Sequence, residues 1–265
     1  MSDFNFNQEK YLKRINLNSD ISVDFESLKR IHRAQHLSIP FENFDICLNR
    51  KIAIDPSSIF NKLVLHKRGG YCFENNALLL IALKNFGFEA RPVLGRVHLS
   101  GEPGGRTHQS TLVKFGDDTW LVDAGFGSES PRTPIPLIPN EVVSFEGINY
   151  RIIQSEMYGY MLQNKTTDDW KNLYSFDLSP VLDIDLNLGN HFTSTSPDSF
   201  FMTARIAALP VENGIKTLYN DRLKKTINGQ EENISLEDNA TYLEVLEREF
   251  GIQLDADYSK LKPLN

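Results

Sequence analysis

The amino-acid sequence predicts an α+β protein whose chain changes character twice. Residues 1–88 are rich in helical patterns, residues 89–190 alternate as β-strands do, and residues 191–265 mix both types. Three observations carry this prediction: helical apolar periodicity near residues 24 and 72, a hairpin signal near residue 116, and a capped helix near residue 241.

In the helical zone, two segments have the clearest pattern. From Asp24 to His36 the residues Leu28, Ile31 and Gln35 fall on one helix face, and Pro40 ends the pattern. A second helix follows Gly69-Gly70 and runs from about Cys72 to Phe86. Gly87 stands where a left-handed cap residue is expected, and Phe88 is placed to fold back on the last turn.

In the β-rich zone, residues 91–99 predict a strand and residues 100–105 a turn-rich loop. Residues 111–115 and 119–123 flank Gly116-Asp117-Asp118, which indicates a hairpin. Further strands are expected at residues 142–145, 150–153 and 158–162.

In the mixed zone, residues 200–207 predict a strand. Residues 241–250 predict a short helix that Gly251 ends.

Composition excludes several classes. The chain has 265 residues, 40% hydrophobic and 24% charged, which is ordinary for a globular protein. A net charge of −7 argues against nucleic acid as a partner. No apolar run approaches the roughly 18 residues of a membrane helix. Without a signal-peptide pattern we expect a cytoplasmic protein, with Cys47 and Cys72 as free thiols.

Cys72 is the first candidate functional residue. It follows two glycines and lies in the first turn of a predicted helix, where free N–H groups and the helix dipole favour a thiolate. The same N–H groups would stabilise an oxyanion. The alternative is a small buried hydrophobic residue.

His108 and Asp123 are the second candidate pair. If Phe115 pairs with Asp118, then Ser110 pairs with Asp123, and His108 lies on the same sheet face as Asp123. The carboxylate would then orient the imidazole toward a nucleophile. A three-residue loop would place the two side chains on opposite faces.

The segment after Asp123 is the third feature. In Asp123-Ala124-Gly125-Phe126-Gly127 the glycines permit close backbone approach to a ligand, and Phe126 would be an apolar pocket wall. No metal site is expected, because His32 and His36 are the closest pair of ligand type and fit an exposed helix surface.

Taken together, these segments resemble the arylamine N-acetyltransferase family, in chain order from about residue 11 to 255. The matching pieces are residues 39–43 (IPFEN), 68–76 (RGGYCFENN), 91–97 (RPVLGRV), 107–108 (TH), 121–127 (LVDAGFG), 193–200 (TSTSPDSF) and 250–254 (FGIQL).

The resemblance implies a helical bundle (1–88), a central β-barrel (89–190) and an α/β lid (191–265), with a Cys-His-Asp core like that of cysteine proteases. It implies Cys72 as nucleophile, His108 as base and Asp123 as the acid that orients it. Glu42 and Arg68 would form a supporting pair. Candidate acceptor contacts are Phe126, Phe41, Tyr71 and Gly125.

The implied activity is ping-pong acetyl transfer from acetyl-CoA, through acetyl-Cys72, to arylamines, arylhydrazines or hydrazides, as in xenobiotic detoxification. Acetyl-CoA would be a cosubstrate, with no permanently bound cofactor. A homodimer is left open. Basic residues available for CoA are Arg96, Arg106, Lys216, Arg222, Lys224 and Lys225.

Three alternatives remain at this point. A papain-like or transglutaminase-like hydrolase would use the same triad. An amide synthase of the same family would take a carrier-bound acyl chain. A decayed, non-catalytic binding module would have an inert Cys72.

Overall fold

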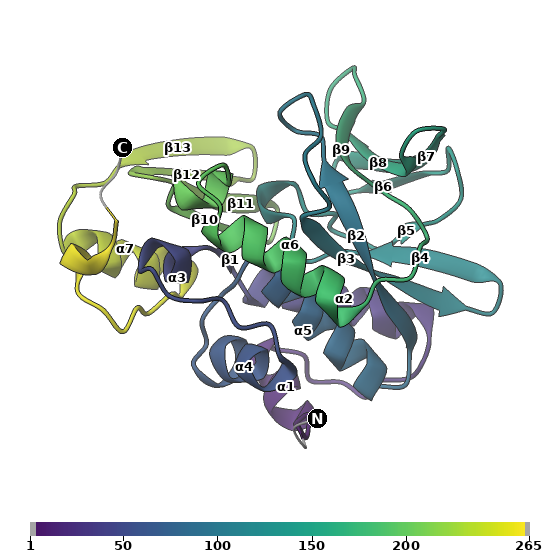
Figure 1. Cartoon of the computed structure of the whole chain (residues 1–265), viewed down its shortest axis with the longest axis horizontal. Helices are drawn as coiled ribbons and strands as arrows, with labels where there is room; N and C mark the ends of the chain where they lie inside the picture. Colours follow the sequence, from purple (N-terminus) through teal and green to yellow (C-terminus); the bar gives the residue numbers. More distant parts are fainter. Residues whose placement is uncertain (1–3, 263–265) are drawn as a thin grey trace.

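The computed structural model describes residues 4–262 as three adjoining parts (Figure 1). Helices from the first third of the chain lie beneath a large antiparallel sheet, and a smaller sheet with its own helix lies beside them. The helices are α1 (Gln8–Arg14), α2 (Phe25–Ser38), α3 (Phe44–Cys47), α4 (Pro56–Phe60), α5 (Cys72–Asn85), α6 (Asp183–Thr195) and α7 (Thr241–Phe250).

Helix α2 forms where the apolar periodicity predicts it. The Asp24 carboxylate caps its start by accepting a hydrogen bond of 2.7 Å from the Ser27 N–H. Leu28, Ile31 and Gln35 are buried, which confirms the predicted face.

His32 and His36, however, are also buried, and the prediction of an exposed helix surface for them is wrong. The helix is covered on a wider arc than its apolar residues indicate, because α5 and the segment after strand β4 (Asp118–Val122) pack against it.

Helix α5 begins and ends as predicted. At its start the Glu74 carboxylate accepts from the Tyr71 N–H at 3.2 Å, as in a capping box. At its end Gly87 has a φ of +93°, and the Phe88 N–H donates to the Leu83 carbonyl at 3.0 Å. This Schellman geometry satisfies the last carbonyls of the helix.

The large sheet has eight antiparallel strands in the order β5-β4-β3-β2-β9-β8-β7-β6. Its strands are β2 (Glu89–Val97), β3 (His108–Phe115), β4 (Asp118–Val122), β5 (Ile135–Pro136), β6 (Val142–Phe145), β7 (Ile148–Ser155), β8 (Gly159–Lys165) and β9 (Lys171–Phe176). An isolated bridge between Pro139 and Ile152 brings the chain after β5 to β7, so the sheet curls into a nearly closed barrel. This α+β arrangement agrees with the predicted fold class.

The predicted hairpin register is confirmed. Phe115 pairs with Asp118 across a two-residue turn, and the ladder continues to Thr111 and Val122. The next step places Ser110 opposite Asp123, so His108 and Asp123 share a face of the sheet.

The smaller sheet joins a short strand from the first third of the chain to four strands from the C-terminal part. It has the order β1-β10-β11-β12-β13 and consists of β1 (Phe41–Glu42), β10 (Ile206–Val211), β11 (Gly214–Tyr219), β12 (Arg222–Ile227) and β13 (Gln230–Ser235). Strand β1 pairs with β10, so the segment before Cys72 is tied to the C-terminal part. Helix α7 packs on this sheet and ends at Gly251, as predicted.

The strand predicted at residues 200–207 is wrong in its first half. Phe200–Met202 form a 3₁₀ turn, and the strand begins only at Ile206. The Asn43 amide donates to the carbonyls of Phe201 and Ala204, which a strand would need for pairing. The boundary predicted at residue 190 lies inside α6, and the division into three domains stays a prediction.

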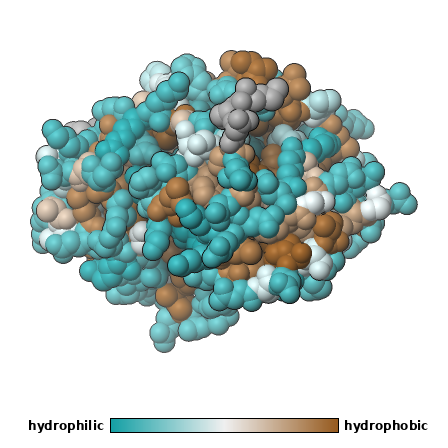
Figure 2. Space-filling view, turned by 90° about the horizontal axis from the view of Figure 1, so that it is seen from below, coloured by the Kyte–Doolittle hydropathy of each residue, from teal (hydrophilic) through white to brown (hydrophobic). Residues whose placement is uncertain are grey.

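The outer surface is mixed in character. On the face seen from below, hydrophilic residues surround several hydrophobic patches (Figure 2). Among residues 4–262, no helix is both long enough and apolar enough to cross a membrane.

Candidate active site

Cys72 is the first residue of α5 and lies at the junction of the helices and the large sheet. It is 4% exposed, and its Sγ lies 3.6 Å from the carbonyl oxygen of Thr107, the residue before β3. A Cβ on Gly70 would approach the Glu74 Cβ to 2.7 Å, so this entry into the helix requires glycine. The free N–H groups of the first turn favour a negative charge on the sulfur.

His108 and Asp123 form a buried pair beside this helix start. The His108 Nε2 lies 2.7 Å from Asp123 Oδ2, and the side chains are 3% and 0% exposed. Because Nε2 faces the carboxylate, Nδ1 is the nitrogen left for a nucleophile.

The charges of the pair support one another. Burial lowers the pKa of His108, but Asp123 and, to a smaller degree, the Cys72 side chain raise it to about 9. Burial raises the pKa of Asp123, yet His108, Asn76 and the Gly125 N–H lower it below its ordinary value. His108 is therefore an imidazolium at neutral pH, which is the partner that a Cys72 thiolate requires.

Aromatic rings surround the imidazole. The ring centroids of Phe126 and Tyr174 lie 4.7 and 4.5 Å from that of His108. Phe41 and Tyr71 both approach Phe201, at 5.9 and 5.7 Å. The predicted acceptor residues thus lie in two aromatic groups, one on His108 and one around Phe201.

Gly125 passes close to the helix that begins with Cys72. A Cβ at this position would lie 2.8 Å from Asn76 Nδ2 and 3.1 Å from Cys72 Cα. The sequence suggested that this glycine lets a ligand approach the backbone; in the structure it lets the Asp123 segment pack against Cys72 and Asn76 of α5.

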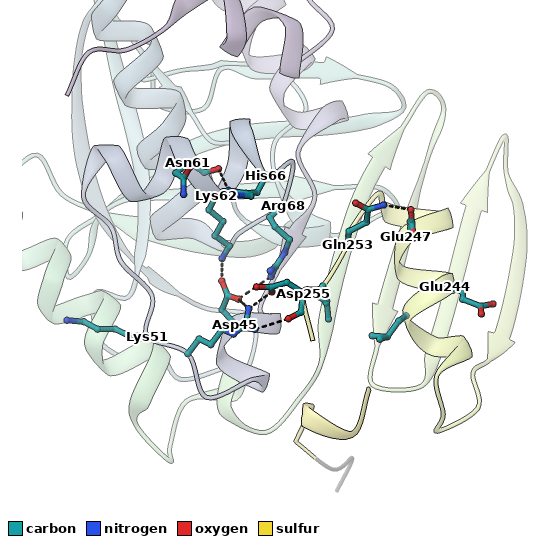
Figure 3. Close-up of a pocket in the computed structure, with 13 residues that line it drawn as sticks. Asp45, Lys51, Asn61, Lys62, His66, Arg68, Glu244, Glu247, Gln253 and Asp255 are labelled. Atoms are coloured by element: carbon teal, nitrogen blue, oxygen red, sulfur yellow. Dashed lines mark hydrogen bonds and ion pairs between the residues drawn. The ribbon is translucent and has the colours of Figure 1, made fainter. Parts of the chain in front are cut away.

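Glu42 and Arg68 form the predicted ion pair within a larger network. Arg68 Nη2 lies 2.7 Å from Glu42 Oε1, and Asp45, Lys62 and Glu74 complete the cluster. Figure 3 shows Lys62 and Arg68 both directed at Asp45. Since Glu74 also caps the start of α5, the network extends to the residue next to Cys72.

A pocket of about 760 Å³ lies on the outer side of this network (Figure 3). Lys62, Arg68 and Asp45 line it together with Glu244 and Asp255 from the α7 side. Cys72, His108 and Asp123 do not line it. Among residues 4–262, no group of three or more His, Cys, Asp or Glu side chains is arranged to hold a metal ion.

The basic residues suggested for CoA are largely engaged with protein groups. Arg106 pairs with Asp177, Lys216 with Glu249, Lys224 with Glu231 and Lys225 with Glu232. Arg96 donates to the Gly104 carbonyl at 2.8 Å. Binding of an anionic ligand by these residues would require exchange of partners.

Sequence reasoning missed three residues of the site. Asn76 and Tyr174 contact the His108–Asp123 pair, and the His32 Nε2 lies 2.9 Å from the Asp123 carbonyl oxygen. Asn76 had a detectable signal, because it stands one helical turn after Cys72 on the same face. Tyr174 and His32 come from distant segments and had none.

The sequence also matches known proteins over most of its length. A family profile described as N-acetyltransferase matches residues 24–259. The chain is 34% identical over 249 residues to an arylamine N-acetyltransferase of Escherichia coli (strain K12), covering 92% of this chain and 88% of that one.

Solved structures of arylamine N-acetyltransferases are also similar to this chain. Mycobacterium marinum arylamine N-acetyltransferase in complex with CoA superposes with a TM-score of 0.90 at 30% identity, covering 97% of each chain. A Bacillus cereus arylamine N-acetyltransferase, noted for a Cys-His-Glu catalytic triad, has a TM-score of 0.87 at 27% identity, over 96% of this chain and all of that one. The chain therefore belongs to the arylamine N-acetyltransferase family of acyltransferases.

Proposed function

We propose that this enzyme transfers the acetyl group of acetyl-CoA to arylamines, arylhydrazines or hydrazides through an acetyl-Cys72 intermediate. The observation that carries the proposal is the contact of Asp123 with His108 at 2.7 Å, beside a cysteine at a helix start. In this proposal Cys72 is the nucleophile, His108 the acid and base, and Asp123 the group that orients and charges His108.

The first half-reaction exchanges one thioester for another. The Cys72 thiolate attacks the acetyl carbonyl, and N–H groups at the start of α5 stabilise the oxyanion. The carbon–sulfur bond to CoA then breaks, and the departing thiolate takes the proton of the His108 imidazolium. Acetyl-Cys72 and a neutral His108 remain, and CoA leaves as its thiol.

The second half-reaction returns the enzyme to its starting state. The acceptor nitrogen attacks the carbonyl of acetyl-Cys72, and His108 removes the nitrogen's proton. Collapse expels the Cys72 thiolate beside a new imidazolium. Since the intermediate is a thioester, the site must exclude water to avoid hydrolysis.

The acceptor is proposed to be flat and apolar. Phe126 lies against His108, Phe41 and Tyr71 lie against Phe201, and Gly125 gives the backbone its close approach. Aromatic walls of this kind favour an aryl ring over a charged aliphatic amine. Such acceptors fit a role in xenobiotic detoxification, which we propose for a cytoplasmic enzyme.

The supporting residues are assigned a structural role. The buried Glu42–Arg68 pair links β1 to the loop before Cys72, and the segment from α6 onward would act as a lid on the site.

The direct test is intact-protein mass spectrometry after incubation with acetyl-CoA. We expect one acetyl adduct on the parent protein and none on Cys72→Ala. Cys47→Ala is the matched control, because Cys47 is the other cysteine and is buried away from His108, and it should keep the adduct. Initial rates with anilines and hydrazides should then give the parallel double-reciprocal lines of ping-pong kinetics.

The alternatives predict different results. Peptide cleavage without an adduct would indicate a hydrolase. A Cys72 that reacts with iodoacetamide but not with acetyl-CoA would indicate an amide synthase with another acyl donor. A Cys72 inert to both reagents would overturn the assignment of this cysteine as a nucleophile.

A further inference from the structure

Asn76 contacts every segment that builds the site. Its Nδ2 donates to Asp123 Oδ1 at 2.8 Å and to the Gln109 carbonyl at 2.6 Å. Its Oδ1 accepts from the Ala124 N–H at 2.9 Å. One side chain therefore joins α5, the strand residue after His108, and the turn that carries Asp123.

Every hydrogen-bonding atom of this amide has a partner. Both Nδ2 hydrogens and the carbonyl oxygen have partners, and the residue is 0% exposed. Only one orientation of the amide is possible, because the reverse orientation would set Oδ1 against a carboxylate and a carbonyl oxygen. The surroundings therefore fit an amide side chain: two oxygen atoms accept from its NH₂ group, and one backbone N–H donates to its oxygen.

Asn76 also stands one helical turn after Cys72. Residues four apart lie on the same helix face, so the Asp123 segment is tied to the same rigid element that carries the sulfur. A displacement of Asp123 or His108 relative to Cys72 would break at least one of the three Asn76 hydrogen bonds.

The Asp123 carboxylate is held at both oxygens. Oδ2 accepts from His108, while Oδ1 accepts from Asn76 and from the Gly125 N–H at 2.8 Å. Two donors on Oδ1 favour the ionised carboxylate and prevent its rotation away from the imidazole.

We propose that Asn76 is a positioning residue that fixes the Asp123–His108 pair relative to Cys72. The inference rests on the proposed function. It adds a fourth residue to the site, which acts through Asp123 and does not touch the acetyl group.

The test measures Cys72 alkylation by iodoacetamide across pH, together with single-turnover acetylation by acetyl-CoA. In Asn76→Ala a less firmly held carboxylate supports the His108 imidazolium less. We expect the pH midpoint of alkylation to rise by about one unit. The acetylation rate should fall about 100-fold, with little change in the acetyl-CoA concentration that gives half-maximal rate.

The chain supplies a matched control in the preceding residue, Asn75. Asn75 is also a buried asparagine of α5, yet its amide only reaches the Pro40 carbonyl at 3.4 Å, and its Oδ1 has no partner. Asn75→Ala should keep the midpoint of the parent and an acetylation rate within about threefold of it.

A second variant separates positioning from folding. Asn76→Asp has the same shape and retains the acceptor for Ala124, but replaces the donor to Asp123 by a carboxylate. Its acetylation rate should fall at least as far as that of Asn76→Ala. An unshifted alkylation midpoint in Asn76→Ala, or an Asn76→Asp protein as fast as the parent, would overturn the proposal. A parent protein whose Cys72 is never alkylated would instead defeat the proposed function.

Discussion

At the scale of single residues, Gly125 shows how tightly the site is assembled. The backbone after Asp123 passes against the first turn of α5, and the missing side chain is what allows it. The φ angle of Gly125 is not positive, so the requirement is space and not backbone conformation.

Gly125→Ala should therefore lower the acetylation rate at least tenfold, because the new methyl group meets the Asn76 amide and the Cys72 backbone. Overpacking of this kind costs about 1–3 kcal/mol of unfolding free energy. Urea denaturation and single-turnover acetylation measure the two effects.

Gly104 is the control for this prediction. A Cβ there would meet nothing within 4 Å, and its φ is not positive either. Gly104→Ala should leave rate and stability unchanged. A fully active Gly125→Ala would mean that the turn after Asp123 can move without harm to the site.

At the scale of elements, the start of α5 depends on the buried ion network. Three carboxylates, Glu42, Asp45 and Glu74, face two cations, Lys62 and Arg68. Burial raises the pKa of Glu74, and Lys62 opposes that rise at 2.7 Å. Lys62 thus favours the ionised form of the capping carboxylate of α5, whose pKa burial still holds above its ordinary value.

Lys62→Met should lower the unfolding free energy by about 3 kcal/mol, because it leaves Glu74 as a buried carboxylate without its cation. The double variant Lys62→Met/Glu74→Gln should recover part of the loss. The amide removes the unpaired charge but retains an oxygen that caps the Tyr71 N–H. Urea denaturation of the single and double variants measures the recovery.

Lys29→Met is the matched surface change. Lys29 pairs with Glu26 at 2.7 Å, but the two side chains are 37% and 73% exposed. The expected cost is below about 1 kcal/mol. Equal losses of unfolding free energy in Lys29→Met and Lys62→Met would show that burial of the network contributes little to stability.

At the scale of the whole molecule, three buried histidines set the pH dependence of stability, because folding lowers the pKa of two of them and raises the pKa of the third. Burial lowers the pKa values of His32 and His36, whereas Asp123 and Cys72 raise that of His108 to about 9 against the lowering effect of burial. The first two are neutral in the folded protein, and the third is charged.

In a Cys72→Ala protein, which lacks the thiolate that would offset the proton held by His108, these shifts predict a maximum of stability near pH 6.5. Below the ordinary histidine pKa of about 6.5, the unfolded chain binds protons that folded His32 and His36 do not, so stability falls as pH falls. Above it, folded His108 keeps its proton while the unfolded chain loses it, so stability falls as pH rises through about 9.

Urea unfolding of the Cys72→Ala protein from pH 5 to 10 tests both the acid and the alkaline fall in stability. His36→Asn should flatten the acid limb, and His108→Asn should flatten the alkaline one, because neither new side chain titrates. A stability curve that is level from pH 6 to 9 would contradict the charge assigned to His108.

The sequence alone determined the features that depend on near neighbours. The cap and periodicity of α2, the glycine end of α5 and the two-residue turn before Asp118 involve residues a few positions apart. The hairpin register followed from that turn, and with it the shared face of His108 and Asp123. These caps, turns and apolar patterns act between near neighbours and agree with the tertiary packing, so they can be predicted from the sequence.

Only the tertiary structure decided the features that need distant partners. Helix α6 was missed although Ile184, Leu188 and Phe192 stand four apart. Only the structure shows that this apolar face is exposed, while Gly189, Asn190 and Thr193 are buried. The burial of His32 and the Asn76–Asp123 hydrogen bond likewise depend on packing between separate segments. Because these buried polar side chains take their partners from distant segments, neither hydropathy nor spacing along the chain reveals such contacts.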